Sequence, residues 1–225
     1  MVSLLSAPGW YRSRPWASKL HMDRLKHWES IYTTRGERDL SWFEEVPAVS
    51  LELIEAAGLS AGTCVVDVGG GESRLVDELL ARGLDCLAVL DVSHEALVRT
   101  RARLGDAAQT VTWIEADVTG AWSLKPMDVW HDRAVFHFLV DADDRRRYVS
   151  HLRETLKLHG SAVIATFAAD GPERCSGLPV VRYSPALLAD ELGDGFTLIE
   201  SRPHLHTTPG GTIQSFQYSR FQRAS

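Results

Sequence analysis

The sequence lacks any apolar run near the roughly 20 residues that a transmembrane helix needs, so we expect no membrane contact. It also lacks internal repeats and low-complexity tracts, and its 44% hydrophobic and 24% charged residues are near globular averages, which excludes disorder, collagen-like repeats and coiled coils. Basic residues are not in excess: 24 Lys and Arg stand against 30 Asp and Glu, a net charge of −6. This balance argues against tight, sequence-independent binding to nucleic acid.

Cysteine is scarce. The three cysteines, Cys64, Cys86 and Cys175, form no CxxC pair, and the first two fall in apolar, strand-like runs, where buried free thiols are the simplest interpretation. Three free thiols suit a reducing cytosol, so we predict a cytoplasmic protein. No spacing is diagnostic of zinc, and we predict no metal site. Two interpretations are open for Cys175, His204 and His206. They line the acceptor pocket or bind a metal, or they are scattered residues of surface loops.

The length of 225 residues favours one domain. Residues 1–21 contain three basic residues, four serines and no acid, a composition that resembles a transit peptide. They lack a sustained amphipathic period, so we expect a flexible leader, or a mis-assigned start ahead of Met22.

Apolar patterns along the rest of the chain alternate between strand and helix periods. Strands are expected at 64–68, 86–90, 111–115, 127–130 and 162–167, and helices at 22–33, 47–57, 72–81, 94–104, 143–158 and 185–192. This alternation predicts βαβ units and a parallel sheet covered on both faces. Two last strands, at 196–201 and 213–221, have no helix between them and predict an antiparallel hairpin at the sheet edge.

The first strand runs into a glycine-rich turn, Asp67-Val68-Gly69-Gly70-Gly71-Glu72, where glycines let a ligand approach the backbone closely. Asp91 ends the second strand 20 residues beyond Gly71, the spacing at which an acid binds ribose hydroxyls. Asp117 follows the third strand, where a carboxylate can accept a hydrogen bond from an adenine amino group. The alternative for the glycines is an ordinary strand-to-helix turn, and the alternative for Asp91 and Asp117 is a capping role at a helix or loop.

This turn departs from the dinucleotide fingerprint. The third glycine of that fingerprint is replaced by Arg74. Glu72 adds an acid where a pyrophosphate would meet the helix N-terminus. Both features favour a cofactor with an amino-acid tail over NAD(P).

Asp67-x-Gly69-x-Gly71, Asp91 and Ala116-Asp117-Val118 resemble the first three motifs of class I S-adenosylmethionine (SAM)-dependent methyltransferases, over residues 24–222. The resemblance implies an α/β, Rossmann-like sheet of seven strands, mostly parallel with an antiparallel last strand, and helices on both faces. It implies SAM as the cofactor, held by Asp67, Gly69, Gly70, Gly71, Asp91, Val92, Asp117 and Val118. On this basis, residues 22–225 form one domain: a helical cap (22–58), a cofactor-binding core (59–168) and an acceptor-side loop with the terminal hairpin (169–225).

A cluster of polar and aromatic residues, 128–138, follows the fourth strand beside the site where open α/β sheets bind ligands. We expect Asp132 to orient the acceptor and His131 or His137 to act as pocket acid or base, against the alternative that all are core residues. The cluster is similar to the Asp-Lys-Gly-Thr segment of a lysine methyltransferase branch that modifies elongation factors and citrate synthase. Here Arg133, Ala134 and Val135 replace the lysine, glycine and threonine of that segment.

The aromatic residues Trp28, Tyr32 and Trp42 resemble that branch's opening, where such residues help cover the cofactor. We therefore expect a SAM-dependent methyltransferase whose acceptor is an amine or other nucleophile of a small molecule or a protein side chain. Nucleic acid is not expected as a partner, because the Asn/Asp-Pro-Pro-Tyr signature is absent. The chain is expected to be a monomer or homodimer. An NAD(P)-dependent Rossmann oxidoreductase and a non-catalytic SAM-binding module are the alternatives.

Overall fold

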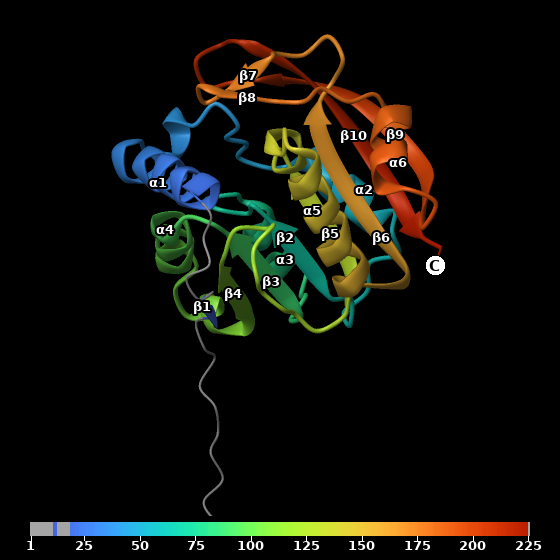
Figure 1. Ribbon diagram of the computed structural model, residues 1–225. Coiled ribbons are helices and arrows are strands. Elements are labelled where there is room, and N and C mark those ends of the chain that lie inside the picture. Colours follow the sequence, from blue (N-terminus) through green and yellow to red (C-terminus); the bar gives the residue numbers. More distant parts are fainter. Residues whose placement is uncertain (1–10, 13–18, 225) are drawn as a thin grey trace, which may run out of the picture.

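The computed structural model describes residues 11–12 and 19–224 (Figure 1), with side chains from residue 23 on. The predicted flexible leader at 1–21 thus lies mostly outside the described residues. Within its bounds, two residues join the sheet as β1 (Tyr11–Arg12), and α1 (Lys19–Thr34) begins three residues before the helix start expected at residue 22.

One sheet organises the molecule. Its members are β1, β2 (Val65–Val68), β3 (Leu87–Asp91), β4 (Val111–Glu115), β5 (Met127–Arg133), β6 (Leu156–Phe167), β9 (Phe196–Thr207) and β10 (Ile213–Arg223), in the spatial order β1-β4-β3-β2-β5-β6-β10-β9. All neighbours pair in parallel except β10, which is antiparallel to both β6 and β9. The predicted Rossmann-like sheet and its terminal hairpin are confirmed, and the two-residue β1 adds an eighth strand to the seven expected.

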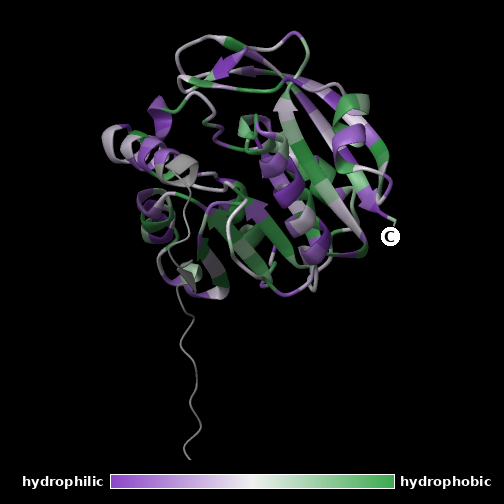
Figure 2. Cartoon of the chain, viewed as in Figure 1, coloured by the Kyte–Doolittle hydropathy of each residue, from purple (hydrophilic) through white to green (hydrophobic). Residues whose placement is uncertain are grey.

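Helices cover both faces of the sheet (Figure 1). Side chains of α2 (Ala48–Glu55), α3 (Leu75–Ala81) and α4 (His94–Leu104) bury one face, and those of α5 (Ala142–Thr155) and α6 (Pro185–Leu192) bury the other. Short 3₁₀ turns occur at Glu37–Asp39, Gly105–Thr110 and Phe136–Phe138, and the small hairpin β7 (Arg174–Cys175) with β8 (Leu178–Pro179) lies above the sheet. Figure 2 shows apolar residues concentrated in the central strands, as burial on both faces requires.

Helix ends follow local chemistry. Ser93 and Ser184 cap α4 and α6 by accepting hydrogen bonds from the backbone N–H groups of Ala96 and Leu187, both at 3.2 Å. The fifth helix ends at Thr155, not at residue 158 as expected, because Leu156 turns to extended backbone and pairs with Met127 as the start of β6. Pairing in the sheet therefore outweighs the helical pattern there.

The prediction of free thiols at Cys64 and Cys86 is wrong: the two residues form a disulfide. They directly precede β2 and β3, and the parallel register of these strands places Val65 opposite Leu87, so the two cysteines are also neighbours. Cys175 is a free thiol, as expected, and it is buried. The cytoplasmic location rested on three free thiols, and that argument no longer holds. Within the described residues, every helix is too short or too polar to cross a bilayer.

Candidate functional site

A cavity with an empty volume of about 850 Å³ opens at the carboxyl ends of the parallel strands, where open α/β sheets bind ligands. It is lined by Arg24, Trp28, Tyr32, Trp42, Gly69, Leu90, Asp91, Val92, Ala116, Asp117, Val118, Arg133, Ala134, Val135, Phe138, Leu139, Cys175, Gln214 and Phe216. Eight of the eleven residues expected to bind the cofactor are among them; Asp67, Gly70 and Gly71 lie behind this lining.

The glycine-rich turn between β2 and α3 adopts backbone angles that favour glycine. Gly69 and Gly71 have φ values of +67° and +39°. A Cβ on Gly71 would lie 2.6 Å from the Tyr32 hydroxyl and 3.0 Å from Asp91 Oδ2, and a Cβ on Gly69 would collide with Val135. The turn thus packs closely against Tyr32 of α1 and against Val135, which leaves no room for side chains at these two positions.

Two buried carboxylates lie at the floor of the site. Asp91 accepts a hydrogen bond from Ser93 N at 2.8 Å, and burial, reinforced by the charge of Asp67, raises the pKa of Asp91 to about 7. Asp67 Oδ1 accepts a hydrogen bond from His131 Nδ1 at 2.7 Å, whereas its Oδ2 is buried with no hydrogen-bond partner. An excess of buried negative charge of this kind favours a cationic ligand.

Asp117 lies at the rim beyond β4. Its Oδ1 accepts hydrogen bonds from the backbone N–H and hydroxyl of Thr119, at 2.8 and 2.7 Å, and its Oδ2 lies 3.2 Å from Arg24. The same arginine forms an ion pair with Asp144 of α5. The two ion pairs of Arg24 therefore connect α1 to the end of β4 and to α5.

An aromatic wall forms the opposite end of the cavity. Trp28 packs edge-on against Trp42 and Phe138, with ring centroids 5.7 and 5.0 Å apart. Arg133 lies 5.1 Å over the Phe216 ring, donates from Nε to the Tyr218 hydroxyl (2.9 Å) and donates from Nη1 to the Trp42 carbonyl (2.7 Å). One guanidinium thus stands in an otherwise apolar, aromatic enclosure.

The residue after Arg133 has a strained backbone. Ala134 has φ +74°, a conformation that costs a non-glycine residue about 1–3 kcal/mol. Ala134 stands where the resembling segment has glycine, so the turn keeps a glycine-like shape despite the substitution.

The three residues expected to be catalytic do not line this cavity. Asp132 is fully buried and accepts hydrogen bonds from Val135 N (2.8 Å), Phe136 N (3.0 Å) and the Tyr148 hydroxyl (2.6 Å), while burial raises its pKa to about 6. It holds the turn after β5 against α5. A direct catalytic role for Asp132 stays a prediction that this geometry does not favour.

The two histidines are also internal. His131 is sandwiched between Asp67 and the Ser50 hydroxyl, at 2.7 and 2.9 Å. His137 is buried, its Nδ1 accepts a hydrogen bond from Phe167 N at 3.2 Å, and burial lowers its pKa to about 3. His137 is therefore neutral near pH 7, and its expected acid–base role likewise stays a prediction.

Sequence reasoning missed part of the lining. Gln214 and Phe216 are two residues apart on β10, so both side chains face the same side of the sheet. They lie far from the glycine-rich turn in the sequence, and no pattern connected them with it. Arg24 also lines the cavity, and no motif in the sequence pointed to it. Cys175 lines the cavity, as one of the weighed alternatives, whereas His204 and His206 lie on β9 outside it.

These features fit SAM, the cofactor implied by the sequence. SAM carries a cationic sulfonium and an ammonium group that offset the buried charges of Asp67 and Asp91. The ribose hydroxyls can donate to Asp91, and Gly69 brings the backbone of the turn to the cavity wall, where the amino-acid tail can meet it. The fit thus rests on charge and space that the described residues provide.

Comparisons with known proteins agree with this geometry. Residues 66–162 match the model of the family described as "Methyltransferase domain". A comparison with curated proteins gives no match.

Among solved structures, the chain is similar to the Burkholderia thailandensis 1,6-didemethyltoxoflavin-N1-methyltransferase, which was crystallised with its substrate and S-adenosylhomocysteine (18% identity, 95% of this chain and 94% of that one, TM-score 0.70). It is also similar to the N-methyltransferase NodS of Bradyrhizobium japonicum (16%, 91% and 99%, 0.66) and to a protein studied for the conversion of a disulfide bond into a thioacetal group during echinomycin biosynthesis (16%, 89% and 91%, 0.72). At these identities the likeness concerns the fold.

Proposed function

We propose that this chain, whose residues 66–162 match the methyltransferase-domain family model, is a SAM-dependent methyltransferase that methylates a nitrogen atom of a small, planar, aromatic molecule. The observation that carries the proposal is the enclosed aromatic end of the cavity, formed by Trp28, Trp42, Phe138 and Phe216. Flat rings stack well on such walls. The similar structures include a 1,6-didemethyltoxoflavin-N1-methyltransferase and a glycopeptide N-methyltransferase, which supports a nitrogen acceptor.

The cavity divides into two parts. Asp91, Val92, Asp117 and Val118 would hold the ribose and adenine, and the turn at Gly69–Gly71 would hold the methionine tail. SAM supplies an electrophilic methyl group and carries its own leaving group. The chain's task is to hold the acceptor in line with that methyl group and to exclude water.

Arg133 is the polar anchor of the acceptor part. Its Nη2 forms an ion pair with Glu44 Oε1 at 3.0 Å, and an acceptor oxygen or ring nitrogen that approaches the guanidinium from the cavity would accept a further hydrogen bond from it. Tyr218, the Trp42 carbonyl and Phe216 fix the guanidinium. The acceptor is thereby expected to carry a hydrogen-bond acceptor on its ring.

Apart from the carboxyls of Asp91 and Asp117, which the proposal assigns to the cofactor, the lining groups that could accept a proton are the Cys175 thiol and the Tyr32 hydroxyl. Burial raises the pKa of the Cys175 thiol to about 11 and that of the Tyr32 hydroxyl well above its usual range. Both groups are thus protonated near pH 7. An aliphatic amine, with an ordinary pKa near 10.4, would arrive protonated, whereas an aromatic ring nitrogen arrives with its lone pair free. This difference favours a heteroaromatic acceptor over a lysine side chain.

The proposal is tested with methyl-labelled SAM and two fractions of a dialysed cell extract, one of proteins and one of small molecules, together with a panel of bicyclic nitrogen heterocycles. We expect label in small molecules only, and an Arg133→Gln variant with a KM for the acceptor raised about tenfold or more and an unchanged Kd for SAM. Label on protein bands would overturn the small-molecule proposal in favour of a protein side chain. SAM binding without any transfer would favour the non-catalytic module.

A further inference from the structure

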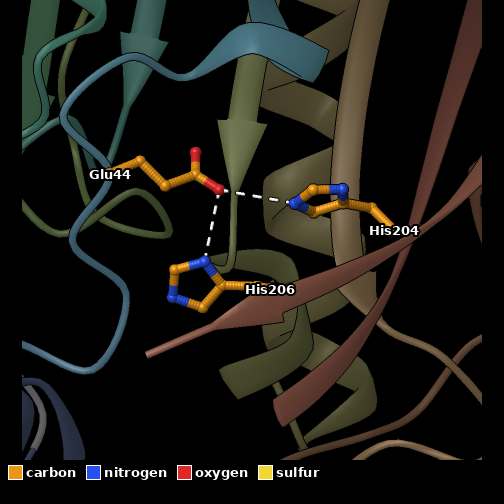
Figure 3. Close-up of side chains that lie close together, drawn as sticks. All are labelled: Glu44, His204 and His206. Atoms are coloured by element: carbon orange, nitrogen blue, oxygen red, sulfur yellow. Dashed lines mark ion pairs between the residues drawn. The ribbon is translucent and has the colours of Figure 1, made fainter. Parts of the chain in front are cut away.

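A second cluster of ligand-type side chains lies outside the cavity (Figure 3). Glu44 comes from the segment between α1 and α2, and His204 and His206 come from β9. Glu44 Oε1 lies 3.6 Å from His204 Nε2 and 3.3 Å from His206 Nδ1, and the three ligand atoms all lie within 4.8 Å of one another. The cavity lining includes none of the three.

The spacing suits a small metal ion. Ligand atoms at about 2.0–2.1 Å from a tetrahedral Zn²⁺ stand about 3.3–3.4 Å apart, close to the two distances from Glu44. His204 and His206 are two residues apart on one strand, so both rings project from the same face of the sheet edge. Two imidazoles and one carboxylate, with a further position open, form a donor set that binds divalent transition metals.

The tautomer of His206 adds an independent observation. His206 is buried and its Nε2 lies 2.7 Å from the carbonyl oxygen of Ser41, so Nε2 carries a proton and donates. This leaves Nδ1 facing Glu44 Oε1 at 3.3 Å, in position to bind an ion on the cluster side of the ring. Histidines that bind a metal through one ring nitrogen usually donate the N–H of the other ring nitrogen to a carboxylate, a backbone carbonyl or water.

Solvent access and a neighbouring positive charge affect how strongly the cluster would bind a metal ion. The His204 side chain is 31% exposed and opens the cluster to solvent. Arg133 Nη2 lies 3.0 Å from the same Glu44 oxygen but makes no hydrogen bond there. Its positive charge opposes a cation, so we expect binding weaker than that of closed structural zinc sites.

We propose that Glu44 Oε1, His204 Nε2 and His206 Nδ1 bind a divalent first-row transition metal of the Zn²⁺ type, with an open position toward solvent. The ion joins the segment that carries Trp42, part of the aromatic wall, to the terminal hairpin. The three ligand residues do not line the cavity, but Glu44 Oε1 lies 3.0 Å from Arg133, which does. Metal binding is measured without an acceptor, so its failure is distinguishable from failure of the proposed function.

The test uses the full chain, free of affinity tag and dialysed against chelator. Zn²⁺ binding is measured by calorimetry without SAM, and Co²⁺ binding by its visible absorption spectrum. We expect one equivalent of each metal and the intense bands of low-coordinate Co²⁺. Glu44→Gln and His204→Ala should each lower the affinity about tenfold or more.

His94→Ala is the matched control, because His94 pairs with Glu115 at 2.8 Å but belongs to no group of three potential ligands in the described part of the chain. SAM binding by each variant verifies that it has folded, and His204→Ala, at a half-buried position, is the variant that best preserves the fold. No stoichiometric binding, or equal affinity in wild type and both cluster variants, would overturn the proposal and leave His206 as a protonated partner of Glu44.

Discussion

Replacing Asp91 by asparagine is expected to make the free protein more stable and SAM binding weaker. Burial raises the pKa of this carboxyl from 3.8 to about 7, which corresponds to about 4 kcal/mol of destabilisation of the folded state when the group is ionised, at pH 8. Asparagine keeps an oxygen to accept the hydrogen bond from Ser93 N but carries no charge. At roughly 2–4 °C per kcal/mol for a chain of this size, the Tm of the free variant should rise by about 10 °C.

The ligand-bound protein should respond in the opposite direction. Ribose hydroxyls donate to the ionised carboxylate, and hydrogen bonds to charged groups contribute about 1.5–3 kcal/mol. Asp91→Asn should therefore weaken SAM binding about 10- to 150-fold, as measured by calorimetry.

The pH dependence separates the two effects. The folded-state pKa of Asp91 is raised, so for this group the folded protein gains stability as the pH falls from about 7 toward 4, and the Tm gap between wild type and variant closes over that range. SAM affinity of the wild type should rise with pH through about 7, whereas the variant should lack this step. A lower Tm for the variant at pH 8, or an unchanged affinity for SAM, would refute the reasoning.

Three further predictions follow from contacts described above. Gly71→Ala should abolish SAM binding in calorimetry while circular dichroism shows that the fold persists. The reason is that the new Cβ would meet Tyr32 and that φ +39° is strained for a residue with a Cβ. Measurable binding would contradict this. Asp132→Asn should lower the free energy of unfolding in urea by about 2–4 kcal/mol, since it disturbs a buried carboxylate with three donors; normal stability with lost turnover would restore its catalytic role. Reducing Cys64–Cys86, which closes a loop with a sequence separation of 22, should cost about 3 kcal/mol without changing the Kd for SAM; a changed Kd would show coupling to the site.

The cofactor side of the site was predictable because its signals are local. A strand, a glycine-rich turn and an acid at the end of the next strand must meet at one edge of a parallel sheet, whatever the rest of the chain does. Gly69, Asp91, Asp117 and Val118 all lie at the cavity for this reason.

The acceptor side was not predictable in this way. Strand β5 runs three residues further than its apolar pattern, to Arg133, so successive side chains point to opposite faces. His131 therefore faces Ser50 of α2 and Asp132 faces Tyr148 of α5, and only Arg133 reaches the cavity. The disulfide was missed because it depends on strand register, which a separation of 22 residues does not reveal.

The strand that carries the two histidines of the proposed metal site also limits how this protein can associate. β9 is twelve residues long and lies at the end of the sheet, where an open edge can template strands from other molecules and lead to aggregation. Pro203 interrupts it near the middle and offers no N–H for such pairing. A second copy that extended the sheet at this edge would lack a hydrogen bond at Pro203, which disfavours pairing along the middle of the strand.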